Sequence, residues 1–156
     1  MQKANNFHTP KQAKLKAMKY CAYQERCQQE VRNKLHELGV YGNDAESIIT
    51  ELISENFINE ERFATLFAGG KFRIKKWGKI KIQHALKQYN ISEYCINKGF
   101  KEIGHADYIK TLKKIIADKK EQIKAANTLA AKKKIIQYAI SKGYESDLVW
   151  EIINNS

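Results

Sequence analysis

Three helix-stop signals recur along the chain at a nearly constant spacing, and they constrain the fold more than any other feature. Gly39, Asn90 and Gly143 each end a run of apolar residues at helical spacing, and they lie 51 and 53 residues apart. Glycine and asparagine end helices readily because they tolerate the left-handed backbone conformation. An apolar residue follows each stop. These matching helix-stop signals, at a period of about fifty residues, predict a tandem repeat.

Each period contains three helical segments. In the first period, Thr9, Pro10 and Gln12 form a helix start signal, because threonine caps a helix and proline suits its first position. No stretch alternates polar and apolar residues as a half-buried strand would. The sequence therefore predicts an all-α chain of three tandem three-helix repeats, stacked into an elongated, curved molecule. The predicted units are an N-terminal tail at 1–10 and repeats at 11–58, 59–104 and 105–156.

The apolar stripes predict the buried residues. In the middle unit, the first helix opens at Asn59 and is expected to break or loosen at Gly69 and Gly70, and a second helix opens near Gly78. The residues expected in the core of this unit are Phe63, Phe67, Ile80, Ile82 and Leu86. Phe100, Tyr138 and Trp150 also lie on apolar stripes and are expected to be buried.

Composition excludes several classes of protein. One proline and 8 glycines are too few for collagen or a turn-dense β-sandwich. No apolar run approaches the ~18 residues needed to span a bilayer, and the first residues lack the apolar segment of a secretory signal. We therefore expect a cytoplasmic monomer without membrane contact. The three cysteines, Cys21, Cys27 and Cys95, are expected to be reduced thiols, since their odd number does not favour a disulfide framework.

Catalytic and metal-binding patterns are missing from the sequence. The segment Gly69-Gly70-Lys71 lacks the upstream glycine spacing of a phosphate loop, and Phe72 stands where that loop has serine or threonine. The 4 histidines are scattered, so a zinc site with ligands at short spacings is not expected. The chain is therefore predicted to have no enzyme activity, no cofactor and no metal.

The basic charge is concentrated in the second and third units. Of the net charge of +11, residues 1–56 carry +1, residues 57–104 carry +6 and residues 105–156 carry +4. No acidic residue occurs between Lys71 and Lys87. Basic clusters at matching places predict a positive track for a phosphate backbone or an acidic filament groove, although lysine-rich faces can also serve solubility alone. The predicted binding residues are Lys71, Arg73, Lys75, Lys76, Trp77, Lys79, Lys81, Lys87, Lys132, Lys133 and Lys134.

Two segments carry motifs of a known family. In residues 17–35, a helix is followed by a short basic turn and by a helix that ends in Lys34-Leu35. In residues 59–86, an Arg-Phe-Ala helix precedes a basic stretch, a glycine and a helix that contains Lys79-Ile80. These motifs resemble the opening stretch and the central signature of the RecX family of bacterial recombination regulators. The resemblance covers residues 13–104.

The resemblance implies a non-enzymatic modulator of the RecA recombinase. Such a protein would lie along the groove of the RecA–DNA filament, inhibit its activities and bind single- or double-stranded DNA weakly in a salt-dependent manner. It would act in recombination, DNA repair and the SOS response. Two other classes stay open: a stand-alone nucleic-acid-binding helical module that acts through phosphate contacts, and an interaction scaffold whose lysines serve only solubility.

Overall fold

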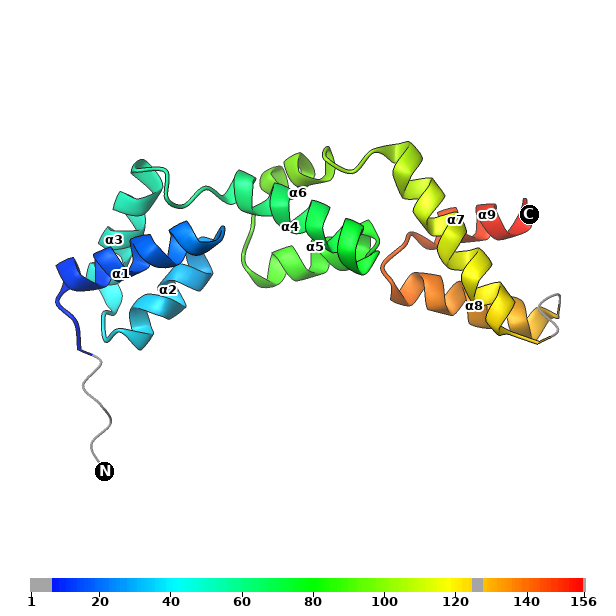
Figure 1. Ribbon diagram of the computed structural model, residues 1–156, viewed down its shortest axis with the longest axis horizontal. Helices are drawn as coiled ribbons and strands as arrows, with labels where there is room; N and C mark the ends of the chain where they lie inside the picture. Colours follow the sequence, from blue (N-terminus) through cyan, green and yellow to red (C-terminus); the bar gives the residue numbers. More distant parts are fainter. Residues whose placement is uncertain (1–6, 125–127, 156) are drawn as a thin grey trace, which may run out of the picture.

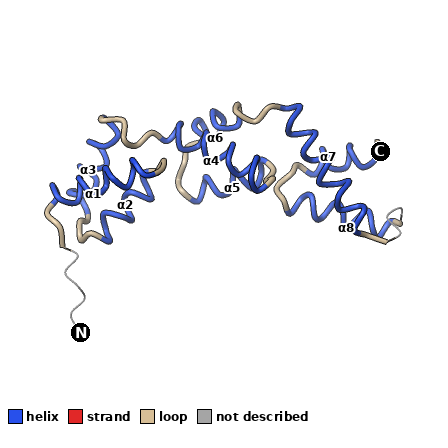
Figure 2. Tube along the Cα trace, in the orientation of Figure 1, coloured by secondary structure: helices blue, strands red, loops and turns tan. Residues whose placement is uncertain are grey.

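The computed structural model describes residues 7–124 and 128–155, and these residues form helices and no strands (Figure 2). Three units of three helices each lie in an elongated row, with α1 and α9 toward opposite ends (Figure 1). The helices are α1 (Pro10–Tyr23), α2 (Gln28–Glu37), α3 (Gly42–Ser54), α4 (Glu60–Lys75), α5 (Lys79–Gln88), α6 (Glu93–Phe100), α7 (His105–Gln122), α8 (Leu129–Ser141) and α9 (Ser146–Asn154). The predicted all-α repeat is confirmed.

The start of α1 is the one that the sequence predicts. Thr9 accepts a hydrogen bond from the backbone N–H of Gln12, whose side chain bonds the N–H of Thr9 in return. Pro10 is already the first residue of α1. The N–H of His8 donates to the carbonyl of Leu38 at 3.0 Å, so the described end of the tail is attached to the first unit. Residues 1–6 lie outside the described part. The unit boundaries at 11–58, 59–104 and 105–156 stay predictions.

The three predicted stops share one hydrogen-bonded geometry. Gly39, Asn90 and Gly143 have φ values of 83°, 59° and 101°. At each stop, the N–H of the next, apolar residue donates to the carbonyl five residues earlier, which satisfies an otherwise unpaired group at the helix end. These bonds join Val40 to Leu35, Ile91 to Leu86 and Tyr144 to Ala139, at 2.9, 3.2 and 3.3 Å. All three apolar residues are buried, so each stop also turns the chain back into the core.

Helix α4 runs unbroken through the glycine pair, where the sequence predicts a break. Gly69 is buried, and a Cβ atom at this position would lie 2.5 Å from the guanidinium of Arg73. Helix α6 approaches α4 so closely that a Cβ atom on Gly99 would lie 2.8 Å from the carbonyl oxygen of Ala64. A glycine inside a helix costs about 1 kcal/mol relative to alanine. Packing of α4 against α6 outweighs this cost, so the predicted break is wrong.

The described residues form two hydrophobic cores. Helices α1–α3 enclose their own core, which includes Val31 and Leu35. Helices α4–α9 share a second core, to which the first unit contributes Cys27 at the N-cap of α2. As predicted, Phe63, Ile82 and Leu86 are buried in the shared core, and Phe67 and Phe100 pack against it. The second and third units therefore form one packed body.

Three predicted core residues are exposed instead: Ile80 by 51%, Tyr138 by 38% and Trp150 by 45%. Ile80 lies in the first turn of α5, where its backbone is held by a hydrogen bond to the carbonyl of Gly143 while its side chain remains exposed. The ring of Tyr138 lies 4.5 Å from Nζ of Lys119, a contact between the surfaces of α8 and α7. Helical periodicity places these residues next to the apolar stripe but does not fix how wide the buried face is.

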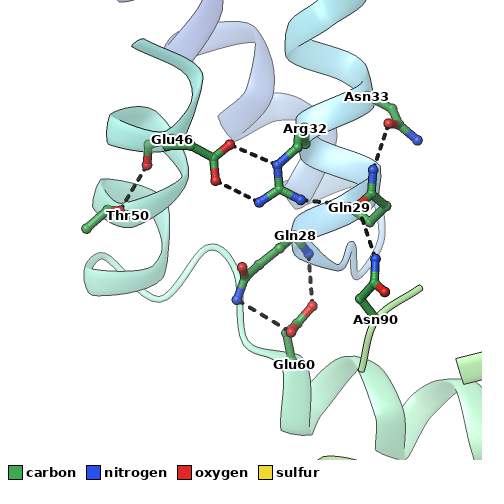
Figure 3. Close-up of polar contacts among 8 residues, drawn as sticks. All are labelled: Gln28, Gln29, Arg32, Asn33, Glu46, Thr50, Glu60 and Asn90. Atoms are coloured by element: carbon green, nitrogen blue, oxygen red, sulfur yellow. Dashed lines mark hydrogen bonds and ion pairs between the residues drawn. The ribbon is translucent and has the colours of Figure 1, made fainter. Parts of the chain in front are cut away.

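A polar junction joins the first unit to this body. Glu60, in the first turn of α4, accepts hydrogen bonds from the backbone N–H of Gln28 at 3.0 Å and from its Nε2 at 3.4 Å (Figure 3). Nearby, Nδ2 of Asn90 donates to Oε1 of Gln29 at 3.4 Å. Burial raises the pKa of Glu60 even though the amide of Gln28 favours its ionised form. The first unit is thus held by hydrogen bonds at the N-terminus of α2, by the ion pair of Glu25 with Arg62 of α4 and by the packing of Cys27 in the shared core.

Candidate functional site

The second and third units meet at the level of the backbone. Gly78, the N-cap of α5, donates its N–H to the carbonyl of Lys142 at 2.8 Å, and Ile80 donates to the carbonyl of Gly143 at 2.9 Å. A Cβ atom on Gly78 would lie 2.3 Å from the carbonyl carbon of Gly143. In turn, a Cβ atom on Gly143 would lie 2.4 Å from Cβ of Lys81. This approach requires glycine on both sides, and it seats the end of α8 against the start of α5.

Two buried tyrosines hold the same junction. The hydroxyl of Tyr144 donates to the carbonyl of Lys76 at 2.8 Å. The hydroxyl of Tyr108 accepts a hydrogen bond from the N–H of Lys79 at 2.9 Å and donates to the carboxylate of Glu145. Burial raises the pKa of both tyrosines, so both hydroxyls remain protonated donors at neutral pH. The backbone around the basic segment is therefore fixed from the third unit.

Four lysines from the two units gather beside this junction. Nζ of Lys71 and Nζ of Lys81 lie 5.0 and 4.7 Å from the centroid of the half-buried Trp77 ring. Nζ of Lys142 donates to the carbonyl of Lys75 at 2.8 Å. The pKa of Lys142 is lowered, first by burial and then by the positive charges of Lys81 and Lys75. We call Lys71, Lys75, Trp77, Lys81 and Lys142 the junction cluster.

The charge of the junction cluster is not compensated within the described residues. None of its four lysines forms an ion pair there, and the same holds for Arg73, Lys76 and Lys79. In the first unit, by contrast, Lys14 bonds both Glu51 and Glu55 at 2.9 Å. Ammonium groups that repel one another and lack carboxylate partners favour an external anion. The cluster is the candidate binding site.

Trp77, one of the predicted binding residues, also packs inside the protein. Its ring packs against the shared core of α4–α9. The same ring also lies within cation–π distance of Lys71 and Lys81. Its partial exposure leaves it accessible between these two ammonium groups.

The other predicted residues lie outside the junction cluster. Lys87, in the last turn of α5, pairs with Glu93 at 3.4 Å. Lys132, Lys133 and Lys134 are exposed near the start of α8, whereas Lys142 follows its end. At 1.5 Å of rise per residue, at least about 12 Å of helix separates the two groups. The two predicted basic clusters are therefore separate patches.

Lys142 belongs to the junction cluster although no sequence pattern marks it. It is the only basic residue between Lys134 and the end of the chain, so it forms no run of charge. The signal that could have found it is structural: Gly143, the residue after it, is the glycine that meets Gly78. Contacts between repeats, rather than local composition, complete the cluster.

The described residues offer neither a membrane-spanning helix nor a metal site. No helix there is both long enough and apolar enough to span a membrane. Likewise, no three side chains of the His, Cys, Asp and Glu types gather there in a metal-binding arrangement.

Comparison with known proteins gives consistent matches along the chain. Three family models match in order: the first three-helix domain of RecX at residues 13–52, the second at 59–99 and the third at 106–153. A Regulatory protein RecX of Lactobacillus johnsonii is 26% identical over 132 residues, which are 85% of this chain and 49% of that protein. The corresponding protein of Clostridium acetobutylicum is 26% identical over 145 residues, 90% of this chain and 67% of that protein.

A solved structure supports the same assignment of the fold. The crystal structure of RecX from Lactobacillus salivarius superposes with a TM-score of 0.80 at 21% sequence identity, over 94% of this chain and 95% of that one. The chain spans about half the length of the Lactobacillus johnsonii relative. Since the three family models together match most of the chain and follow one another in the order of its helical units, the chain belongs to the RecX family of regulatory proteins.

Proposed function

We propose that this chain is a non-enzymatic inhibitor of the RecA recombinase that binds along the RecA–DNA filament through the junction cluster. In this role it would modulate recombination, DNA repair and the SOS response in the cytoplasm, acting as a monomer. The observation that carries the proposal is a group of four lysines without a carboxylate partner among the described residues: Lys71 and Lys81 lie over the Trp77 ring, and Lys142 lies beside Lys75 and Lys81. Family membership supports the regulatory role.

The geometry of the junction cluster suits a polyanion. Lysines bind phosphates as mobile point charges, and binding releases the counterions of the nucleic acid. Lys75 and Lys142 come from different units, but the glycine contact holds them together before any ligand arrives. Binding then requires little ordering of the protein, which lowers its entropic cost. A tryptophan between two lysines also suits an unstacked base of single-stranded DNA.

The decisive experiment compares two triple variants in a RecA assay. Lys71→Gln/Lys75→Gln/Lys81→Gln removes three charges of the junction cluster. Lys11→Gln/Lys16→Gln/Lys19→Gln removes three exposed charges of the first unit and serves as the matched control. The wild-type chain should slow RecA-catalysed ATP hydrolysis and strand exchange. The cluster variant should lose most of this inhibition, and the control should retain most of it.

Salt dependence tests the proposed contacts separately. Each lost phosphate contact should reduce the slope of log affinity against log salt concentration by about 0.7 to 0.9, so the cluster variant should lose about 2 to 3 units of slope on single-stranded DNA. Equal losses in both variants would mean that only total charge matters. A wild-type chain that binds DNA but leaves RecA unaffected would contradict the proposal and favour the stand-alone nucleic-acid-binding module.

A further inference from the structure

A groove opens between α7 and α9 in the third unit. It has a volume of about 650 Å³, and none of its lining residues belongs to the junction cluster. Apolar side chains from both helices line it: Ile109 and Ile116 from α7, and Leu148 and Ile152 from α9. It is therefore a surface that the proposed function does not use.

The groove follows from a difference in side-chain size between the repeats. In the second unit, Ala64 and Gly99 allow the backbones of α4 and α6 to touch. Counted from the N-caps of α4 and α7 and from the stops before α6 and α9, the matching residues of the third unit are Ile109 and Ile152. Two branched side chains thus replace a small pair, and α7 and α9 meet over a much shorter stretch than α4 and α6.

The two edges of the groove carry opposite charges. Lys113 and Lys120 lie on the α7 edge, and Glu151 lies on the α9 edge. All three side chains are exposed, and none forms an ion pair within the described residues. The lining residues of α7 run from His105 to Lys120 along one helical face, a length of about 22 Å at 1.5 Å per residue. The groove is thus long enough for about four turns of a bound helix.

We propose that this groove binds an amphipathic helix of a partner protein, with acidic residues toward α7 and a basic residue toward α9. An apolar stripe at helical spacing would fill the floor, as in other helix-in-groove complexes. The unpaired lysines on the α7 edge would attract the acidic side of the bound helix, and the glutamate on the α9 edge would attract its basic side. A second copy of the chain lacks such a helix among its described residues, because each of α1–α9 already places buried residues in one of the two cores.

The proposal can be tested with a synthetic peptide in place of the natural partner. The probe is an 18-residue helical peptide with leucines on one face, glutamates along one flank and lysines along the other. Its binding is followed by fluorescence anisotropy and by the NMR signals of the isoleucine δ-methyl groups. The peptide should shift the signals of Ile109 and Ile152, and a scrambled peptide of the same composition should not.

A pair of charge-reversal variants locates the binding. Lys113→Glu/Lys120→Glu reverses the α7 edge and should weaken binding about tenfold, since each exposed pair contributes up to about 1 kcal/mol. Lys132→Glu/Lys133→Glu makes the same change in charge on exposed α8 residues that lie outside the groove and form no ion pair within the described part of the chain, and it should weaken binding by less than about twofold. Equal weakening by both variants, unmoved methyl signals, or equal binding of the scrambled peptide would overturn the proposal. A dimer of the wild-type chain in sedimentation that Lys113→Glu/Lys120→Glu dissociates would also overturn it.

Discussion

Replacing Gly78 with alanine should separate the second and third units without changing any charge. The φ and ψ of Gly78, −78° and 168°, are ordinary for alanine, so the backbone conformation is not the obstacle. The obstacle is contact, because the new Cβ atom would lie 2.3 Å from the carbonyl carbon and oxygen of Gly143 and 2.5 Å from the nitrogen of Tyr144. These are backbone atoms, which cannot move aside as a flexible side chain can.

The cost can be worked out from what the contact holds. Overpacking costs about 1 to 3 kcal/mol, and the two backbone–backbone hydrogen bonds that Gly78 and Ile80 donate to the third unit contribute about 1 kcal/mol each. The free energy of unfolding should therefore fall by about 3 to 5 kcal/mol. Because Lys142 would move away from Lys75 and Lys81, affinity for single-stranded DNA and for the RecA filament should fall as well, although every lysine remains.

Urea denaturation and salt-dependent binding measure the two effects. The control is Gly70→Ala in α4, where an added Cβ atom meets nothing within 4 Å. This control should stabilise the chain by about 0.5 to 1 kcal/mol and leave binding unchanged. An unchanged urea midpoint for Gly78→Ala would refute the steric reasoning. A destabilised Gly78→Ala that still binds with the wild-type salt slope would refute the dependence of the cluster on the junction.

Three further predictions concern the cores and the junction of the first unit. Leu86→Ala truncates a fully buried side chain and should lower the free energy of unfolding by about 2 to 5 kcal/mol. Ile80→Ala truncates an exposed side chain and should change it by less than about 1 kcal/mol, and the midpoints of urea denaturation measure both effects. Burial raises the pKa of the Cys27 thiol to about 12, so a thiol reagent should modify half-buried Cys95 in the native protein and leave Cys27 unmodified, as peptide mapping would show. Because the pKa of Glu60 is higher in the folded state than its ordinary value of 4.5, the free energy of unfolding should fall as the pH rises from 4.5 through the folded-state pKa. This fall in stability should appear in unfolding curves of the wild type and be absent in Glu60→Gln.

The parts of the fold that are set by residues close together in the sequence could be predicted from it. Gly39, Asn90 and Gly143 end helices through bonds that span five residues, so local signals suffice. The break expected at Gly69 is absent because the packing of α4 against α6 keeps the helix continuous, and this packing joins residues that are far apart in sequence. Ile80 was misplaced because periodicity identifies a stripe and not its edges.

The candidate site likewise contains residues that the sequence predicts and one that only the tertiary structure brings in. Lys71, Lys75 and Lys81 are close in sequence, and no acidic residue lies between them, so the sequence alone predicts a cluster of positive charge. Lys142 joins them only because two glycines, 65 residues apart, bring α5 and α8 into backbone contact. The charge pattern of the sequence therefore predicts where the junction cluster lies, and the contact between the second and third repeats adds Lys142 to it.

The division into two hydrophobic cores determines how the chain can open. Helices α4–α9 bury side chains in common, so they should unfold as one cooperative body. Helices α1–α3 can unfold separately once the hydrogen bonds around Glu60, the Glu25–Arg62 ion pair and the packing of Cys27 in the shared core are lost. Local opening of the first unit would then leave the junction cluster assembled. A binding partner would find the cluster preformed in both conformers, and its affinity would not depend on the fraction of molecules in which the first unit is folded.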